Sequence, residues 1–371
     1  MTTTPALLHG LPPFDQPLNA AGTFTPVGVS RASPAVAEAT AWALQRFLVI
    51  DEWQDLASRE LAAFSGAAAG TVVHCAAAGI TLCVAAAMAG TDPRRIAQLP
   101  DSEGLRRAVV VPAPHLIDYG HPLATDIRLA GGTVRACGQP ERCTADDWLP
   151  ALAAPEVGCL LLVSSRLTRD PAFDFAAATE AARAARVPVV IDGAAQDLRV
   201  RELVALQPAA VVLSAQKYLA APTAGLVVGE AGFIEAVRAQ QKGIGRAMKP
   251  SKEALVGVLA ALHERRALDL GAWSRQQEAK VRQAVDALGG LPGVQAMRMP
   301  DPLGAPVPRV RLRFAGGAEA ARAAAQALRR QDPPVWVMEH GVAEGVLTLE
   351  LIALRADEVD ALTGALRRCL A

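Results

Sequence analysis

The chain is short of aromatic residues and carries no net charge. Only 4% of its 371 residues are aromatic although 51% are hydrophobic, and alanine recurs throughout. The 37 basic residues balance the 37 acidic ones. Because proteins that bind nucleic acids usually carry a basic surplus, this balance argues against a nucleic-acid partner. The composition instead favours a helix-rich α/β enzyme with a small-molecule substrate.

Cysteine is also scarce, and its spacing is uninformative for metals or disulfides. No CxxC pair occurs and no His/Cys cluster has the spacing of a zinc site, so we expect no metal. The chain is too long, and its cysteines too few, for a disulfide scaffold, and reduced thiols in the cytosol are expected. The six cysteines are Cys75, Cys83, Cys137, Cys143, Cys159 and Cys369.

Long hydrophobic runs are missing as well. Runs such as residues 85–89 are apolar but far shorter than a membrane span, so no membrane partner is expected. Residues 1–19 have neither the basic start nor the apolar centre of a signal peptide. Together with the cysteines, these features predict a cytoplasmic protein.

The length and the order of elements predict three regions. Residues 1–33, rich in Pro, Gly and Thr, read as an N-terminal arm. Residues 34–250 alternate apolar strands with helices, which is typical of a mostly parallel sheet covered on both faces. Within them, residues 225–229 are expected to form an antiparallel edge strand. Residues 251–371 predict a long linking helix followed by a small α+β domain.

Two apolar strands end in residues that suit pyridoxal phosphate (PLP) chemistry. Residues 187–191 lead into Asp192, and residues 211–216 lead into Lys217. A lysine amine can form a Schiff base with the cofactor aldehyde, and an aspartate can pair with the protonated pyridine nitrogen. An aspartate that caps the next helix and a lysine on the surface are the alternatives. The combination of the two favours the catalytic interpretation.

The phosphate of such a cofactor needs donors. Residues 74–79 join a strand to a helix through small residues, and the free N–H groups of a helix start attract phosphate. Ser214, three residues before Lys217, offers a hydroxyl. Strand–helix turns of small residues are also common packing devices, so this signal is weak by itself.

Other polar residues admit two interpretations each. His115 is a candidate for stacking on the cofactor ring, or else a polar loop histidine. Arg246 and Lys249 lie in a glycine-containing loop that is either an anion site or a solvated hinge. His121 is expected to be structural.

Taken together, these segments resemble the selenocysteine synthase-like group of fold-type I PLP enzymes, and within it the shorter members of the D-glucosaminate-6-phosphate ammonia-lyase type. The resemblance covers about residues 19–263. It rests on the order and spacing of Asn19–Gly28, Ala76–Gly79, His115 with Tyr119-Gly120, Asp192–Gln196, Ser214–Lys217, and Gly245–Lys249 with Lys252-Glu253.

The resemblance implies an aspartate aminotransferase-like fold, PLP bound at Lys217 and a homodimer or larger even assembly with sites at subunit interfaces. It implies that Asp192 pairs with the pyridine nitrogen and that His115 stacks on the ring. The further cofactor contacts it implies are Cys75, Ala76, Ala77, Ala194, Gln196 and Ser214. The candidates for substrate or anion binding are Thr23, His74, Tyr119, Arg166, Arg246 and Lys249.

The chain departs from the family at three places. His74-Cys75 stands where relatives have Ser-Gly, which puts the usual substrate in doubt. Residues 348–354 lack the Asp-Pro-Arg-like segment, so a substrate carboxylate would need another group such as Arg166, Arg169 or Arg309. The additional N-terminal tRNA-binding region of selenocysteine synthase is absent, which argues against chemistry on a charged tRNA.

The predicted reaction begins with removal of a Cα proton by Lys217. Loss of a β-hydroxyl, with release of ammonia, would make the protein a lyase acting on a small hydroxylated or sugar-derived amino acid. A racemase or epimerase is the alternative, with His74, Cys75 or Tyr119 as the second acid–base group, and a retro-aldol lyase is a third. A non-catalytic ligand-binding protein is disfavoured because Asp192 and Lys217 are both present.

Overall fold

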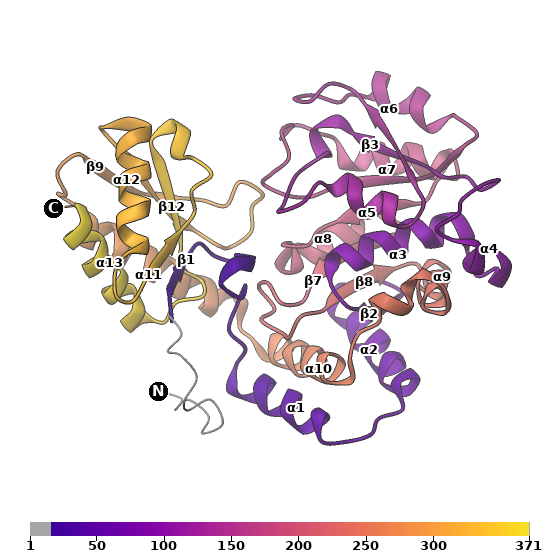
Figure 1. Ribbon diagram of the computed structural model, residues 1–371, viewed down its shortest axis with the longest axis horizontal. Coiled ribbons are helices and arrows are strands. Elements are labelled where there is room, and N and C mark those ends of the chain that lie inside the picture. Colours follow the sequence, from indigo (N-terminus) through magenta and orange to yellow (C-terminus); the bar gives the residue numbers. More distant parts are fainter. Residues whose placement is uncertain (1–15, 371) are drawn as a thin grey trace. The chain divides into compact units, whose positions relative to one another are not determined.

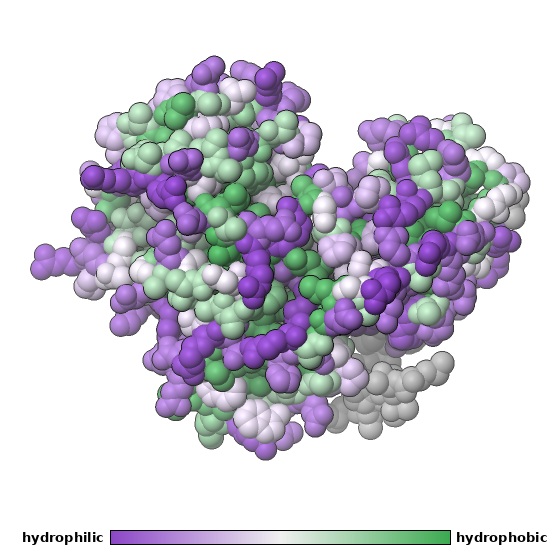
Figure 2. Space-filling model, turned by 180° about the vertical axis from the view of Figure 1, so that it is seen from behind, coloured by the Kyte–Doolittle hydropathy of each residue, from purple (hydrophilic) through white to green (hydrophobic). Residues whose placement is uncertain are grey.

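The computed structural model describes residues 16–370, which form two compact units (Figure 1). The large unit comprises residues 30–268. The small unit combines the described residues up to Val29 with those from Asp269 onward. Seen from behind, hydrophilic residues are interspersed with apolar ones over the surface (Figure 2).

A seven-stranded sheet organises the large unit. Five of its strands, β3 to β7, run parallel to one another, and β8 is antiparallel to both of its neighbours. β3, β5, β6 and β7 are buried on both faces and are almost continuously apolar, whereas the edge strand β4 is only partly buried. In spatial order the strands are β2 (Ala69–Val73), β8 (Gly225–Gly229), β7 (Ala210–Ser214), β6 (Val189–Asp192), β5 (Val157–Val163), β3 (Ala108–Pro112) and β4 (Thr133–Cys137).

Helices cover both faces of this sheet, and each face has its own apolar core. One face packs against α3 (Ala76–Ala89), α4 (Pro93–Gln98), α5 (Leu123–Leu129) and α9 (Ala231–Ala239). The other packs against α1 (Pro34–Leu44), α2 (Ile50–Ser65), α6 (Ala145–Leu152), α7 (Phe175–Ala184), α8 (Val200–Ala205) and α10 (Lys252–Ala267). The predicted α/β class with a mostly parallel sheet is therefore confirmed.

The expectation that residues 225–229 form an edge strand is wrong in one respect. β8 is antiparallel as predicted, but it lies between β7 and β2. The reason is that β2, from an early part of the chain, adds to its outer side. All five residues of β8 are buried, as an internal position requires.

The small unit begins where the long helical stretch breaks. Residues 252–288 form two helices, α10 and α11 (Leu270–Leu288), with Asp269 as the N-cap of the second. β9 (Val294–Met299), β10 (Arg309–Phe314) and β12 (Val346–Glu350) form an antiparallel sheet packed by α11, α12 (Gly317–Arg329) and α13 (Ala356–Leu370). β1 (Leu18–Ala20) pairs in parallel with β11 (Val335–Val337). The described residues of the predicted arm up to Val29 belong to this unit, whereas residues 30–33 belong to the large unit.

A buried ion cluster lies inside the small unit. The Arg309 guanidinium donates from Nε to Glu350 Oε2 at 2.7 Å and from Nη1 to Asp301 Oδ2 at 2.6 Å. All three side chains are at least nine-tenths buried. Arg309 was one candidate for binding a substrate carboxylate, but two carboxylates of the chain itself already occupy its guanidinium. The structure therefore argues against that role.

Within residues 16–370, none of the helices is long and apolar enough to cross a bilayer. In the same range, no group of three or more His, Cys, Asp or Glu side chains is placed to hold a metal ion.

The Arg309 cluster gives a stability prediction. Glu350→Gln removes one of two charges facing a buried guanidinium, so we expect the free energy of unfolding to fall by about 3 kcal/mol. The matched control is Glu278→Gln, which removes the partner of the exposed Arg298 and should cost below about 1 kcal/mol. Urea denaturation of the full chain measures both. Equal losses for the two variants would contradict the assignment of a buried, interdependent cluster.

Candidate functional site

Asp192 and Lys217 meet because β6 and β7 are neighbouring parallel strands. Asp192 is the last residue of β6 and lies opposite Val212 of β7. Ser214 ends β7, and the turn that follows is closed by the Lys217 N–H, which donates to Ser214 O at 3.2 Å. Both functional side chains thus start from the carboxyl edge of the sheet, where open α/β folds bind their ligands.

The Asp192 carboxyl is held in an environment that does not favour its charge. Its side chain is 5% exposed, and Oδ1 accepts a hydrogen bond from Ala194 N–H at 3.0 Å. Burial raises the pKa of Asp192, and Asp126 acts in the same direction, whereas the Ala194 N–H and the Lys217 charge oppose the shift. A cation placed beside this carboxyl would therefore gain strongly from the interaction.

The start of α3 lies at the same edge and offers backbone donors. Cys75 is its N-cap, with Sγ accepting from Ala78 N–H at 3.5 Å, and Ala76 and Ala77 are half-buried. On the adjacent strand, a Cβ at Gly225 would lie 2.3 Å from Cys75 O, so only glycine permits this close approach. The first turn of a 14-residue helix is thereby presented with little side-chain bulk around it.

The loop with Arg246 and Lys249 is tied to this helix start. His74 N–H donates to Met248 O at 2.9 Å, and Met248 and Ile244 pack against the core face that α3 covers. His74, Arg246 and Lys249 are all exposed. The backbone contact places the segment of both cations beside the exposed His74.

His115 occupies a different environment from the one that ring stacking requires. It is fully buried, with Phe173 at 4.5 Å and Phe175 at 5.4 Å between ring centroids. Its Nδ1 accepts from Val163 N–H at 3.2 Å, and burial lowers its pKa to about 4 against a smaller opposing effect of Asp170. A neutral histidine enclosed by aromatic rings presents no open face, so this position argues against stacking on a cofactor.

Tyr119 belongs to a network that the sequence did not reveal. Its hydroxyl donates to Asp126 Oδ2 and lies 2.8 Å from His121 Nε2, which is itself 3.1 Å from Asp126 Oδ1. Burial and the Asp126 hydrogen bond raise the pKa of Tyr119, and Asp192 and Cys75 contribute in the same direction. The loop after β3 thus carries a proton-holding hydroxyl on the side of the sheet where Asp192 lies.

An ion pair that the sequence did not reveal, between Asp197 and Arg265, stabilises the turn that contains Lys217. The Asp197 carboxylate accepts from Arg265 Nη1 at 2.9 Å, and Arg265 Nη2 donates to Tyr218 O at 2.6 Å. Asp197 is buried, which raises its pKa, while Arg265 and, less strongly, Lys217 lower it. Gln196, a predicted cofactor contact, is also buried and accepts from Arg199 at 3.4 Å. An acid–arginine pair separated by 68 positions gives no signal in one sequence.

The remaining candidates lie on loops or in the small unit. Arg166 and Arg169 are exposed on the segment that follows β5, and Arg169 N–H donates to Pro114 O at 3.3 Å. This segment leaves the carboxyl edge beside β6, so both arginines remain predicted carboxylate ligands. Thr23 is half-buried in the small unit, just before the short 3-10 turn Thr25–Val27.

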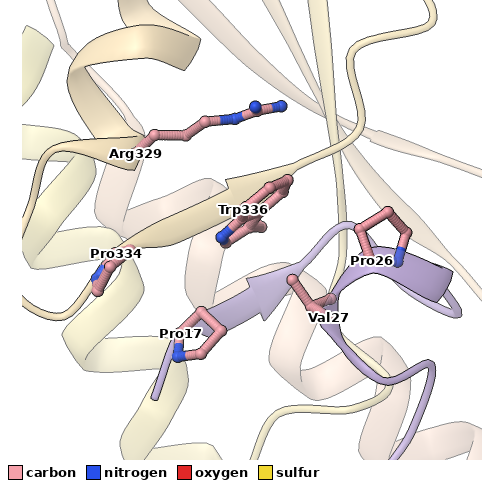
Figure 3. A pocket seen from close by; sticks show the side chains of 6 residues that line it. All are labelled: Pro17, Pro26, Val27, Arg329, Pro334 and Trp336. Carbon is pink, nitrogen blue, oxygen red and sulfur yellow. The ribbon is translucent and has the colours of Figure 1, made fainter. Parts of the chain in front are cut away.

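The small unit also has an open groove of its own with a volume of about 390 Å³ (Figure 3). Its lining is Pro17, Pro26, Val27, Arg329, Pro334 and Trp336. The Arg329 guanidinium lies 4.2 Å from the Trp336 ring centroid and pairs with Glu339, so its charge is already balanced. This groove contains none of the predicted catalytic groups.

The residues at the sheet edge suit PLP. A protonated pyridine nitrogen would complement the buried Asp192 carboxyl, and the small-residue turn at Cys75–Ala77 leaves backbone donors for a phosphate. The close approach of Gly225 to Cys75 O, which a Cβ would prevent, holds this turn against β8. Lys217 lies near enough to Asp192 for its charge to lower the pKa of that carboxyl.

Comparison with known proteins agrees with this architecture. No protein-family model matches the chain. D-glucosaminate-6-phosphate ammonia lyase of Salmonella typhimurium is 30% identical over 353 residues, which are 94% of each chain. A solved structure of D-glucosaminate-6-phosphate ammonia-lyase has a TM-score of 0.86 at 29% identity and 99% coverage of both chains.

One further sequence relative and one solved structure are also similar to this chain. The 5'-C-glycyluridine monooxygenase-decarboxylase of a Streptomyces species is 29% identical over 95% of this chain and 89% of its own. Alanine–glyoxylate aminotransferase from Nostoc shares the fold at 16% identity, with a TM-score of 0.65 and full coverage of both chains. Identity, coverage and the arrangement of the sheet edge together show that the chain belongs to the D-glucosaminate-6-phosphate ammonia lyase family of fold-type I enzymes.

Proposed function

We propose that this chain is a PLP-dependent ammonia-lyase that acts on a small hydroxylated or sugar-derived amino acid. The observation that carries the proposal is the placement of Asp192 and Lys217 at the ends of adjacent strands beside the start of α3. A cytoplasmic location belongs to the same proposal and is supported by the six free cysteines. The reaction named for the 30% identical relative is consistent with it.

The chain's own residues divide the work. PLP, when bound, supplies an electron-accepting ring that stabilises negative charge at Cα of an attached amino acid. Asp192 keeps the proton on the ring nitrogen, and Lys217 is the base that removes the Cα proton. The backbone donors at Cys75–Ala77 and the Ser214 hydroxyl hold the phosphate. The ion pair of Asp197 with Arg265 fixes the turn from which Lys217 reaches the site.

Departure of a β-hydroxyl as water needs an acid. Tyr119 is proposed as the donor because its hydroxyl lies in a hydrogen-bonded network with Asp126 and His121. Burial and Asp126 raise its pKa, so the hydroxyl is protonated near neutral pH although it is a weaker acid than a free tyrosine. With an exposed fraction of 39%, the tyrosine remains accessible to a substrate. His121 and Asp126 hold its hydroxyl and can return a proton to it after each turnover.

Arg246 and Lys249 are proposed to bind an anionic group of the substrate. The hydrogen bond from His74 N–H to Met248 O fixes their loop against the helix start, and both cations are exposed. A phosphate or carboxylate at that place would be neutralised by two charges while His74 donates a further hydrogen bond. The substitution of His-Cys for the family's Ser-Gly would then contribute to substrate selection.

A homodimer is part of the proposal. Five large apolar side chains between the last turn of α1 and the first residue of α2 are exposed in the described chain, Phe47 completely and Val49 by 60%. The equal numbers of acidic and basic residues leave two copies without net repulsion. A second copy of this chain covering the patch would remove these side chains from water. The patch consists of Trp42, Leu44, Phe47, Val49 and Ile50.

The reaction is tested by proton NMR in heavy water, with PLP-loaded enzyme and a panel of D- and L-amino acids that includes phosphorylated sugar amino acids. We expect a 2-oxo acid and ammonia in equal amounts. Lys217→Ala should lose the visible absorbance of the bound cofactor and lower kcat by about 10²- to 10⁴-fold. Deuterium at Cα of both enantiomers without net loss would indicate a racemase, and release of carbon dioxide with oxygen consumption would indicate the reaction of the Streptomyces relative. Either result contradicts the lyase.

The anion site is tested by steady-state kinetics on the phosphorylated substrates of that panel. Lys249→Gln should raise KM by about tenfold, since a charge-assisted hydrogen bond contributes about 1.5–3 kcal/mol. The kcat value and the cofactor absorbance should change little. Lys242→Gln, an exposed lysine earlier in the same stretch, is the matched control and should leave KM unchanged. A similar KM in both variants would refute the assignment.

The homodimer is tested by light scattering coupled to gel filtration over a range of protein concentrations. Phe47→Asp should weaken association by at least about tenfold, because an exposed aromatic anchor is replaced by a charge. Leu129→Asp changes another exposed apolar residue, which is 53% exposed and lies on α5, and should leave association intact. A wild-type protein that is monomeric at all concentrations would rule out the assembly.

A further inference from the structure

Two thiols lie together at one edge of the large sheet. Cys137 is the last residue of β4, the edge strand next to β3, and Cys143 follows the turn of residues 138–142. Their Sγ atoms are 3.7 Å apart, and both side chains belong to the same apolar core. Neither cysteine has a part in the proposed lyase chemistry.

The turn between Cys137 and Cys143 has a defined conformation in which the two thiols face each other. Gln139 N–H donates to Arg142 O at 2.8 Å, and Arg142 N–H donates back to Gln139 O at 3.1 Å. Gly138 has a φ of +77°, and a Cβ there would lie 2.8 Å from the Cys143 Cβ. Glycine at this position therefore lets the two cysteines approach each other.

The surroundings distinguish this pair from the other buried cysteines. The Cys143 thiol, which can donate to the Cys137 sulfur, lowers the pKa of Cys137, and Arg135 acts in the same direction against burial and Asp147. Burial instead raises the pKa of Cys159 to about 12. The thiolate is the reactive form of a cysteine, so Cys137 is a better nucleophile than its partner Cys143.

Access comes through the turn. Cys137 is 8% and Cys143 4% exposed, but residues 139–142 above them are exposed to solvent. Among the described strands, β4 pairs with β3 alone, so its end and the adjoining turn can open locally without disturbing the rest of the sheet.

We propose that Cys137 and Cys143 form a redox-active dithiol that low-molecular-weight disulfides oxidise to an intramolecular disulfide. The Cys137 thiolate attacks one sulfur of the small disulfide, forms a mixed disulfide and releases one small thiolate. Cys143 then loses its proton and attacks the Cys137 sulfur, which releases the second small thiolate. The two protein thiols lose two electrons and two protons, and one small disulfide is reduced to two thiols.

Formation of the disulfide would affect the segment after β5, which lies beside the proposed catalytic site. The sulfurs must move from 3.7 Å to about 2.0 Å apart, which displaces Cys143. Cys143 N–H donates to Asp170 Oδ2 at 3.0 Å, and Asp170 Oδ1 accepts from Ala172 N–H at 3.2 Å, directly before Phe173. Oxidation therefore acts on the segment that follows β5 and carries Arg166 and Arg169.

The test uses the native full chain and glutathione disulfide. After incubation, remaining thiols are alkylated and a non-reduced digest is mapped by mass spectrometry. We expect a peptide pair linked between Cys137 and Cys143, an intact mass lower by two hydrogen atoms, and full reversal by excess reduced glutathione. Cys143→Ser should instead retain a stable glutathione adduct on Cys137, because no resolving thiol is present.

Cys369→Ser, which changes a half-exposed cysteine in the small unit, is the matched control and should form the same bridge as wild type. Circular dichroism of Cys143→Ser verifies that the variant is folded, and Cys143→Ala provides a second variant at the same position. Complete alkylation of Cys137 and Cys143 after exposure to the oxidant, with or without modification at Cys75, would overturn the proposal.

Discussion

The energetic constraint at the centre of this protein is the burial of the Asp192 carboxyl at the end of an apolar strand. Solvation of that charge is replaced by one backbone N–H and by the field of Lys217, which together only partly offset the cost of burial. The arrangement is tolerable because the strand order puts a cation, Lys217, in the turn directly after the neighbouring strand β7. It also means that a positively charged ring seated between the two side chains would relieve an existing electrostatic cost, so cofactor binding and folding favour the same geometry.

Much of the fold was readable because its signals are local. Apolar runs that end in Asp192 and Lys217 identify two strands and their carboxyl ends, and parallel order follows from the helix between them. The edge assignment of residues 225–229 failed for the opposite reason. The partner that covers β8 is β2, about 150 positions earlier, and a single sequence does not show which distant strand completes a sheet.

The site was predicted only in part, and there is a physical reason why some of its residues could be predicted and others could not. Residues at strand ends and the small residues at a helix start can be recognised from the sequence directly around them. Asp126, by contrast, becomes important only because the loop after β3 folds back to place Tyr119 and His121 against it. His115 looked like a loop residue open to a ligand, and the distant Phe173 and Phe175 enclose it. Arg309 looked available until Asp301 and Glu350 were found around it.

Apart from the Ser214 hydroxyl, the phosphate end of the proposed site is built from main chain, and this has a consequence for how such an enzyme can diverge. Backbone N–H groups at the start of α3 do not depend on which side chains stand there, and the close approach of Gly225 to Cys75 O preserves their position. The groups that bind the cofactor phosphate are therefore different from the side chains that select the substrate. The cofactor grip can stay constant while positions 74 and 75 change identity, and a histidine and a cysteine can replace smaller residues as a new recognition surface. A scaffold of this kind can acquire new substrates without first losing its cofactor.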